Sequence, residues 1–231
     1  MGRAHDAAAL QPTDFVSIAS HELRAPIAVV HGIAATLHDR IDNLDEGQVH
    51  ALLGTLVQQT DRLRDLADQL LDLTQIESGS SAAHEERFHP RERVEELLPR
   101  IAADRLDDVR VRVHGDCELV ADAAAFERVA ANLIVNALRY GEAPVEIRSE
   151  NGDCFRLVVE DRGDGVDPDF VPHLFERFSR SDETRRAGVP GAGLGLSIAS
   201  AYAASLGGTL EYEPAQPRGA RFTLSLPAAR S

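Results

Sequence analysis

Two apolar repeats in the first third of the chain constrain the fold more than any other feature. The first repeat alternates steps of four and three residues, the spacing of a heptad seam. Its members are Leu23, Ile27, Val30, Ala34, Leu37 and Ile41. The members of the second repeat are Val49, Leu52, Leu56, Leu63, Leu66, Leu70 and Leu73, with the polar Gln59 as its one interruption. Each seam predicts a long helix that buries one stripe of its surface.

The polar stretch NLDEG, which contains Gly47, separates the two seams. A connection this short between two long helices predicts an antiparallel hairpin. One hairpin has too little apolar surface to pack against, so we expect two copies to form a four-helix bundle, and hence a homodimer. The alternative is a hairpin that packs on a second domain of its own chain.

After the hairpin the pattern changes to mixed helices and strands. The small and charged residues of ESGSSAAHEERF predict a linker, which we place at residues 79–87. Helical stretches such as AAAFERVAANLIVNALRYG and GLSIASAYAASLGG then alternate irregularly with strand-like stretches such as VRVRV, TLEYEP and ARFTLSLP. VEIRSENGDCFRLVVED predicts a strand hairpin that turns at Asn151 and Gly152. We expect a mixed sheet covered by helices on one face.

The predicted fold class is therefore two domains. An N-terminal segment at residues 1–12 precedes an all-α hairpin domain at 13–78, and an α+β sandwich at 88–231 follows the linker. The net charge of −14 argues against a nucleic-acid partner or an anionic membrane surface. No run approaches the roughly 18 apolar residues that span a bilayer. We expect no membrane contact within this chain and a cytoplasmic location; the anchor of a membrane-bound sensor would lie outside these residues.

The stretch SHELRAP places His21 beside Glu22, with Pro26 one turn further on. Neighbours on a helix point about 100° apart, so the pair cannot share a buried face. His21 lies two residues before the seam position Leu23, about 200° around the helix, and we expect its side chain to face solvent. Taken alone, this pattern is more typical of a solvated surface histidine.

Three stretches in the second half suit a nucleotide. In EDRGDGVDPD, Asp161 ends a strand and Gly163 and Gly165 follow. Glycines let a backbone come close to a flat ligand, and the carboxylate can accept a hydrogen bond from an exocyclic amine such as that of adenine. An ordinary tight turn is the alternative.

The other two stretches suit phosphates and a cation. PGAGLGLSIAS places Gly191, Gly193 and Gly195 before a helix, whose free amides and positive dipole end favour phosphate. NLIVNALRYG places Asn132 and Asn136 four residues apart on one helix face. Side-chain amide oxygens suit Mg²⁺, which takes its remaining ligands from phosphates and water.

Five stretches in this order resemble the motif boxes of the sensor histidine kinases of two-component signalling, from about residue 13 to residue 227. SHELRAP resembles the phosphoacceptor box, NLIVNALRY the asparagine box, DRGDGV and GAGLGL the two glycine boxes, and LFERFSR the phenylalanine box. The resemblance implies a HisKA-type dimerisation and phosphotransfer domain joined to an ATP-binding domain of the Bergerat (GHKL) type. It also implies ATP and Mg²⁺ as cofactors, and as partner the receiver domain of a cognate response regulator, whose aspartate takes the phosphoryl group.

Carried onto this sequence, the resemblance makes His21 the phosphorylated residue and Glu22 the general base at its other ring nitrogen. Asp161 would read the adenine amine and repel the acceptor oxygen of guanine. Asn136 would hold Mg²⁺, with Asn132 near the phosphates.

The resemblance also assigns residues around the transferred group. Tyr140 would pack on the base, and Arg180, or as second choice Arg177, would stabilise charge on the phosphoryl group. Residues 179–192 would form a mobile lid without regular structure. Arg139 stands where the family usually has Lys and would contact phosphate through a guanidinium fork instead.

Ala25 stands where the family pattern often carries Thr or Asn, a side chain that can hold a water for removing phosphate from the regulator. Alanine has no such atom, so we expect weak phosphatase activity. Two other functions fit parts of the pattern: a nucleotide-binding dimeric scaffold without transfer (a pseudokinase), and a GHKL ATPase that hydrolyses ATP to drive a clamp.

Overall fold

The computed structural model describes residues 12–78, 84–151, 154–186 and 191–227. The chain divides into two compact units, with the boundary in the long second helix between Leu71 and Asp72. The residues before α1, most of the predicted linker and Gly152 of the predicted strand turn lie outside the described residues.

The first unit is a helical hairpin. Its elements are α1 (Pro12–Arg40), the short 3-10 helix η1 (Ile41–Asn43) and α2 (Glu46–Ser78), whose last turns belong to the second unit. The amide of Gln48 donates to Asp45 Oδ1 over 2.8 Å, and the amide of Asp45 donates to Gln48 Oε1 over 3.0 Å. This reciprocal pair of bonds is a capping box. It starts α2 before Gly47, so Gly47 lies in the first turn of the helix and not in the predicted turn.

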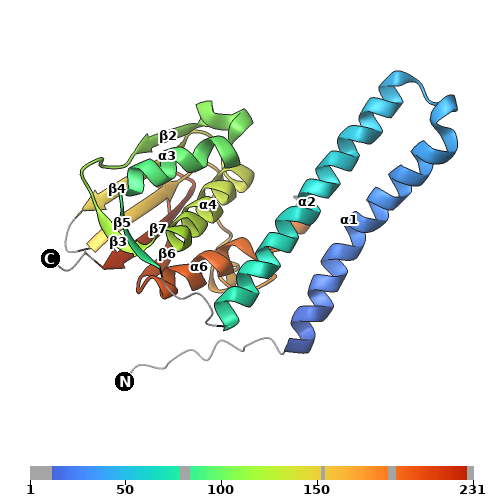
Figure 1. Ribbon diagram of the computed structural model, residues 1–231. Coiled ribbons are helices and arrows are strands. Elements are labelled where there is room, and N and C mark those ends of the chain that lie inside the picture. The colour runs from blue at the N-terminus through green and yellow to red at the C-terminus, as the bar shows by residue number, and fades with distance from the viewer. Residues whose placement is uncertain (1–11, 79–83, 152–153, 187–190, 228–231) are drawn as a thin grey trace. The chain divides into compact units, whose positions relative to one another are not determined.

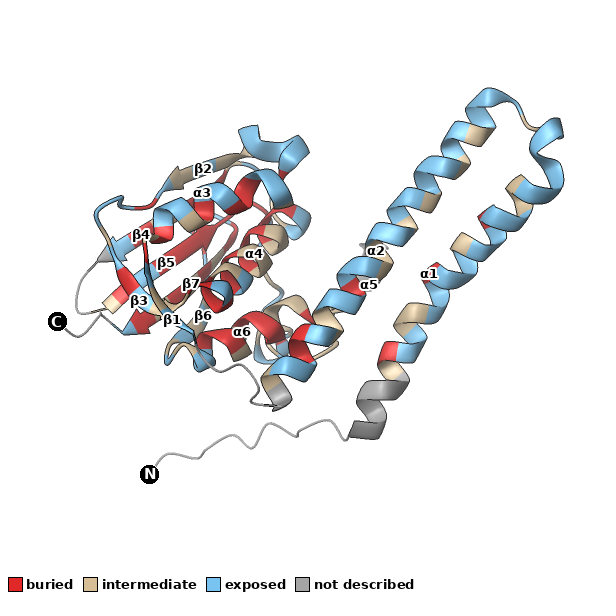
Figure 2. Ribbon diagram, viewed as in Figure 1, coloured by how far each residue is buried: buried red, intermediate tan, exposed pale blue. Residues whose placement is uncertain are grey.

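Most of the described hairpin is coloured as exposed in Figure 2, and its exposed residues include several large apolar ones. The buried positions Ala19, Pro26 and Ile33 of α1 recur every seven residues and so form one stripe. The seam residue Ile27 of α1 is nevertheless 51% exposed, and Val57 of α2 is 57% exposed. Large apolar side chains left open on both helices indicate an interaction surface. No helix among the described residues is both long and apolar enough to cross a membrane.

The second unit is an α+β sandwich, which confirms the predicted fold class. Its strands are β1 (Glu85–Phe88), β2 (Val109–Arg112), β3 (Leu119–Asp122), β4 (Val145–Asn151), β5 (Cys154–Glu160), β6 (Thr209–Pro214) and β7 (Ala220–Pro227). Its other helices are α3 (Pro90–Ile101), α4 (Ala123–Tyr140), α5 (Asp182–Arg186) and α6 (Gly195–Ser205), with 3-10 helices η2 (Ala103–Asp108) and η3 (Val171–His173).

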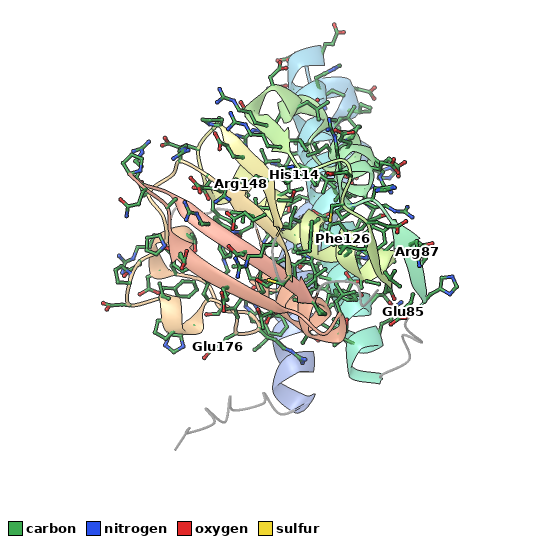
Figure 3. The ribbon with its side chains drawn as sticks, turned by 90° about the vertical axis from the view of Figure 1, so that its left-hand side faces the viewer. Glu85, Arg87, His114, Phe126, Arg148 and Glu176 are labelled. Atoms are coloured by element: carbon green, nitrogen blue, oxygen red, sulfur yellow. The ribbon has the colours of Figure 1, made fainter. Side chains whose placement is uncertain are left out.

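The strands form a mixed sheet with one covered face. Its order is β2-β4-β5-β7-β6, in which β2 runs parallel to β4 and the other neighbours are antiparallel. Along β7, buried residues alternate with half-buried ones, as the period of a strand requires. Helices α3, α4 and α6 lie over the buried side, and charged side chains such as Arg148 stand on the other (Figures 1 and 3).

Aromatic packing joins the helix layer to the strands. Phe126 of α4 is fully buried, and its ring centroid lies 5.3 Å from that of Phe88 and 6.3 Å from that of Phe155. Phe88 ends β1 and Phe155 lies in β5, so one side chain of α4 contacts both the small ribbon and the main sheet. Asp122 caps the start of α4 by accepting a hydrogen bond from the amide of Ala125 over 3.0 Å.

Strand β1 lies within the stretch that the sequence analysis assigned to the linker and extends to Phe88. It pairs antiparallel with β3, with Glu85 opposite Asp122 and Phe88 opposite Leu119. The charged run HEERF carries one apolar residue, so its own pattern shows no alternation. Pairing with a partner strand and the burial of Phe88 produce the strand, and neither is a local property of these residues.

The last turns of α2 are anchored within the second unit, where Asp72 is 4% and Leu73 1% exposed. Asp72 Oδ1 accepts a hydrogen bond from the hydroxyl of Tyr202 on α6 over 3.0 Å and lies 3.4 Å from Nε of Arg128 on α4. Burial, followed by the charge of Asp72 and its hydrogen bond, raises the pKa of Tyr202 to about 12. A buried carboxylate needs such partners, so Asp72 ties the end of α2 to α4 and α6.

Candidate functional site

Asp161 is the buried carboxylate at the centre of the second unit's candidate site. It follows the last residue of β5 and is 3% exposed. Its Oδ1 accepts hydrogen bonds from the amides of Gly163, over 2.9 Å, and Ala220, over 3.3 Å. Burial raises the pKa of Asp161 above its ordinary value, against the opposing effect of these two amides. Both donors found in the described part of the chain reach Oδ1, so Oδ2 is the oxygen that a ligand can use.

Two glycines that the sequence analysis did not single out pack against Asp161. A Cβ on Gly141 would lie 2.3 Å from Asp161 Cγ, and one on Gly219 would lie 2.0 Å from the Asp161 carbonyl oxygen. Gly219 also has a φ of +117°, a conformation that favours glycine. The end of α4 and the turn before β7 therefore come close to the carboxylate because both residues lack a side chain. Their places in the sequence mark a helix end and a turn, but which residue they face is set by the tertiary fold.

The predicted glycines after Asp161 lie in the same group. A Cβ on Gly163 would lie 3.0 Å from the Cα of Gly141, so the two backbones are in contact. Gly165 has a φ of +82°, and a Cβ there would lie 3.0 Å from the carbonyl oxygen of Gly219. The first glycine motif thus closes against the end of α4 and against the turn before β7.

The asparagine pair on α4 meets the second glycine motif. Asn132 and Asn136 are both half-buried and lie one turn apart. The side-chain amide of Asn132 donates to the Arg128 carbonyl over 2.8 Å, and a Cβ on Gly195 would lie 3.0 Å from Asn132 Oδ1. Gly195 is the first residue of α6. Asn132 therefore reaches the start of α6, where the first amides have no partner inside the helix.

Gly193 brings the second glycine motif against the phenylalanine motif. It has a φ of +72°, and a Cβ there would lie 2.6 Å from the Ser179 carbonyl oxygen and 2.9 Å from the carbonyl carbon of Phe178. Phe178 itself has a φ of 59°, which is rare for a residue with a side chain. Gly191, the first glycine of the motif, has a φ of +147°.

The predicted lid, residues 179–192, contains a short helix where the sequence analysis expected none. The amide of Thr184 donates to Ser181 Oγ over 3.2 Å, which caps the start of α5. Arg180 Nη2 donates to the carbonyl of Thr184 over 3.3 Å, so the guanidinium is held at this helix. The stretch SDET is the local signal that sequence reasoning missed. Residues 187–190 of the predicted lid lie outside the described residues.

Arg139 and Tyr140 end α4 and are both exposed. Arg139 lines a cavity of about 330 Å³ between the end of α3 and α4, together with Arg105 and other residues. The lining of that cavity includes neither Asn136 nor Asp161. The structure thus places Gly141, Gly163 and Gly219 against Asp161, and Gly195 against Asn132, while the Arg139 side chain lines the cavity beside α3.

The candidate site of the first unit is His21. Its side chain is 79% exposed, as the sequence predicts for a position away from the seam. Nδ1 of His21 lies 3.9 Å from Glu22 Oε1, while Glu22 Oε2 lies 3.8 Å from Nη2 of Arg62 on α2. Since Nδ1 faces the carboxylate, Nε2 is the ring nitrogen available to an incoming group. Arg62 was not predicted, because only the folded hairpin brings it beside Glu22.

The two sites have complementary chemistry. A buried carboxylate oxygen beside glycines whose backbones touch, and an asparagine at the start of a helix, suit an adenine amine at one end and phosphates at the other. An exposed imidazole with a carboxylate at one nitrogen suits a nucleophile. The chain therefore carries a nucleotide-type site and a separate acceptor-type histidine.

Two family models match the chain. The model described as histidine kinase-, DNA gyrase B-, and HSP90-like ATPase matches residues 121–230, and the His Kinase A (phospho-acceptor) domain matches residues 12–79. The first of these implies ATP binding by the second unit.

Several proteins with histidine kinase names are similar to the chain over most of its length. The chain is 30% identical to the signal transduction histidine-protein kinase AfsQ2 of Streptomyces coelicolor, over 92% of this chain and 41% of the relative. It is also 30% identical to the sensor-like histidine kinase SenX3 of Mycobacterium tuberculosis, over 93% of this chain and 53% of the relative. Among solved structures, the histidine kinase AdeS of Acinetobacter baumannii superposes with a TM-score of 0.72 at 28% identity, covering 91% of this chain and 98% of AdeS.

A phosphoacceptor hairpin followed by a gyrase-like ATPase domain defines the catalytic core of a two-component kinase. The chain belongs to the sensor histidine kinase family, and its second unit has the Bergerat fold. It spans 41% and 53% of the lengths of the two curated relatives.

Proposed function

We propose that this chain is an ATP-dependent protein-histidine kinase that phosphorylates His21 and passes the phosphoryl group to an aspartate of a response regulator. One observation carries the proposal: a histidine that is 79% exposed and faces a carboxylate at Nδ1 occurs in the same chain as a buried nucleotide-type carboxylate, Asp161. A scaffold that binds nucleotide without transferring it does not require an exposed histidine with a carboxylate at Nδ1. A clamp ATPase does not require one either.

The chemistry at the hairpin follows from the orientation of His21. Nε2 attacks the γ-phosphorus of ATP, and Glu22 accepts the proton from Nδ1 as general base. The exposure of the ring allows a nucleotide bound elsewhere to reach it. The phosphorylated nitrogen then faces solvent, where a receiver domain can take the phosphoryl group.

The residues around Asp161 would hold the nucleotide. Oδ2 of Asp161 would accept a hydrogen bond from the exocyclic amine of adenine, and Tyr140 would pack on the base. Gly163 and Gly165 would let the backbone approach the base. Asn132 would hold the phosphates at the start of α6, together with the backbone of Gly191, Gly193 and Gly195.

Three more residues would act near the phosphates. Asn136 offers a side-chain amide oxygen one turn from Asn132, which suits Mg²⁺; a bound Mg²⁺ supplies charge neutralisation of the transferring group. Arg180 would stabilise charge on that group from the lid. Arg139 would contact phosphate through its guanidinium.

The proposed partners follow from the hairpin. We propose a homodimer, because large apolar side chains such as Ile27 and Val57 stay exposed on both helices of the hairpin. We also propose a cognate receiver domain as the phosphate acceptor. We place the dimerisation and phosphotransfer domain at 13–78 and the ATP-binding domain at 88–231, with β1 added to it. Weak phosphatase activity remains part of the proposal, because Ala25 offers no atom to hold a water.

The test is phosphotransfer in two stages. The chain is incubated with Mg²⁺ and γ-labelled ATP, freed of nucleotide, and then mixed with purified receiver domains one at a time. We expect label on the chain in the first stage and rapid transfer to one receiver domain in the second. Steady release of free phosphate from ATP without any labelled chain would support the clamp ATPase instead, and nucleotide binding without either product would support the scaffold.

A further inference from the structure

Arg62 is a charged residue of the hairpin that the proposed roles do not use. Its Nη2 lies 3.8 Å from Glu22 Oε2, and the two side chains are 35% and 27% exposed. The other oxygen of the same carboxylate, Oε1, lies 3.9 Å from His21 Nδ1. One carboxylate thus stands between an imidazole beside it on α1 and a guanidinium on α2.

The ion pair between Arg62 and Glu22 affects the orientation of the Glu22 carboxylate more than the stability of the hairpin. Partly exposed ion pairs contribute little to the free energy of unfolding. A glutamate side chain, however, has several freely rotating bonds, and their freedom must be lost whenever the carboxylate works in one position. A guanidinium that attracts Oε2 limits this freedom, and it leaves Oε1 directed at the ring nitrogen.

We infer that Arg62 is a positioning residue for the phosphorylation of His21, acting through Glu22; this rests on the proposed function. In the step, the lone pair of His21 Nε2 forms the N–P bond while the bond between the γ-phosphorus and its bridging oxygen breaks. ADP leaves with that electron pair, and the Nδ1 proton passes to Glu22 Oε1 and then to water. Arg62 keeps Oε1 where the proton is released.

The position of Arg62 also makes the rate of phosphorylation depend on the arrangement of the hairpin. Glu22 belongs to α1 and Arg62 to α2, so the orientation of the base depends on how the two helices of the hairpin are spaced. A change in that spacing would alter the rate of phosphorylation without any change at the nucleotide site.

The test compares Arg62→Gln with Arg64→Gln. Arg64 lies on the same helix, is 69% exposed and pairs with Asp61 at 2.9 Å, so its replacement removes a similar side chain and ion pair without touching Glu22. We expect Arg62→Gln to lower the maximal rate of autophosphorylation by about tenfold, as displacement of a catalytic group does. The KM for ATP should not change, and Arg64→Gln should match the parent.

Two further variants separate positioning from a structural role. Arg62→Lys retains a charge that can reach one carboxylate oxygen and should recover most of the rate. In a Glu22→Gln background, Arg62→Gln should add no further loss to the rate that this background gives, because its effect passes through Glu22. If Arg62→Gln also lowers the melting temperature, Arg62→Lys and the double variant still decide the question.

The outcomes distinguish the inference from the proposed function. A parent protein that forms no phosphohistidine overturns the proposed function itself. An active parent with a parent-like Arg62→Gln, a changed KM for ATP, no recovery by Arg62→Lys, or losses that multiply in the double variant each overturn the positioning role alone.

Discussion

The two units of this chain differ in how completely each buries its own apolar residues. Of the nine large hydrophobic residues exposed among the described residues, six belong to the hairpin, although it is the smaller unit. The α+β unit instead has a closed core, in which Phe126, Leu133 and Phe222 are at most 1% exposed. Figure 2 shows the same contrast, with the buried class concentrated in the sheet and its helices. The difference indicates that the ATP-binding unit can fold alone, whereas the hairpin leaves apolar side chains open that the proposed homodimer would cover.

The chemistry divides in the same way as the packing. The hairpin exposes His21, which in the proposed function is reached by a nucleotide and then by a receiver domain. The α+β unit buries Asp161, which in the proposed function binds the adenine base away from bulk water. Each of the following substitutions changes one unit, and the binding, association or stability of the other unit is then compared with that of the parent.

The largest expected effect is that of His21→Gln. We expect complete loss of phosphate incorporation, because glutamine has no imidazole nitrogen to accept the phosphoryl group. ATP affinity and dimer formation should stay close to those of the parent. Filter assays with labelled ATP measure the first property, and calorimetric titration and sedimentation measure the others. Loss of nucleotide binding in this variant would contradict the separation of the two sites.

Asp161→Asn should weaken ATP binding by about 10- to 100-fold, the effect of losing a hydrogen bond to a charged group. The preference for ATP over GTP should also fall. Isothermal titration with both nucleotides measures these changes, and the helical dimer should be unaffected. Parent-like binding would show that the nucleotide site lies elsewhere.

The same variant tests the cost of burying the carboxylate. Because burial raises the pKa of Asp161 in the folded state, its contribution to stability is fully present below the unfolded pKa and is lost as pH rises through the folded pKa. At neutral pH the charged group is buried without that contribution. We therefore expect the nucleotide-free variant to melt no lower than the parent near neutrality, and to lack the parent's relative gain in acid.

Val57→Glu should break the hairpin's association and leave the other unit intact. Val57 is 57% exposed in the single chain, and a charge buried in a dimer interface without a partner is costly. We expect the dimer dissociation constant to rise by at least about tenfold. Sedimentation equilibrium measures it, with the neighbouring Gln58→Glu as a control of equal added charge. A dimer as tight as the parent's would place the interface on another surface.

The smallest expected effect is that of Tyr202→Phe, which removes the donor to Asp72 and leaves Arg128 beside it. The free energy of unfolding of the α+β unit should fall by about 1 kcal/mol near pH 7. The folded pKa of Tyr202, about 12, is raised, so its contribution is present below the ordinary tyrosine value of about 10 and is lost as pH rises toward 12. Urea unfolding should therefore show the gap between parent and variant narrowing in that range. A constant gap would contradict the cause assigned to the pKa.

Sequence reasoning succeeded where the signal is local. The heptad spacing of the first 78 residues predicted both long helices, and the alternation of ARFTLSLP predicted β7, because each element buries one face of its own period. The exposure of His21 followed from its angle to the seam. These features depend on residues within a few positions of one another.

The parts that were missed depend on contacts between distant segments. Strand β1 forms because β3 pairs with it. Gly141 and Gly219 contribute to the site because Asp161 lies against them. Arg62 lies near Glu22 only because the hairpin folds back on itself. The helix α5 is the exception, since Ser181 and Thr184 carry a recognisable capping signal that was overlooked.

The most direct test of the central claim is the position and chemical type of the phosphate on the protein. The chain is incubated with Mg²⁺ and ATP, digested at alkaline pH, and its peptides are sequenced by mass spectrometry, while parallel samples are held in acid and in alkali. The account predicts phosphate on His21 that is lost in acid and kept in alkali, as a phosphorus–nitrogen bond requires. Phosphate that survives acid, or that maps to a residue outside the hairpin, would contradict it.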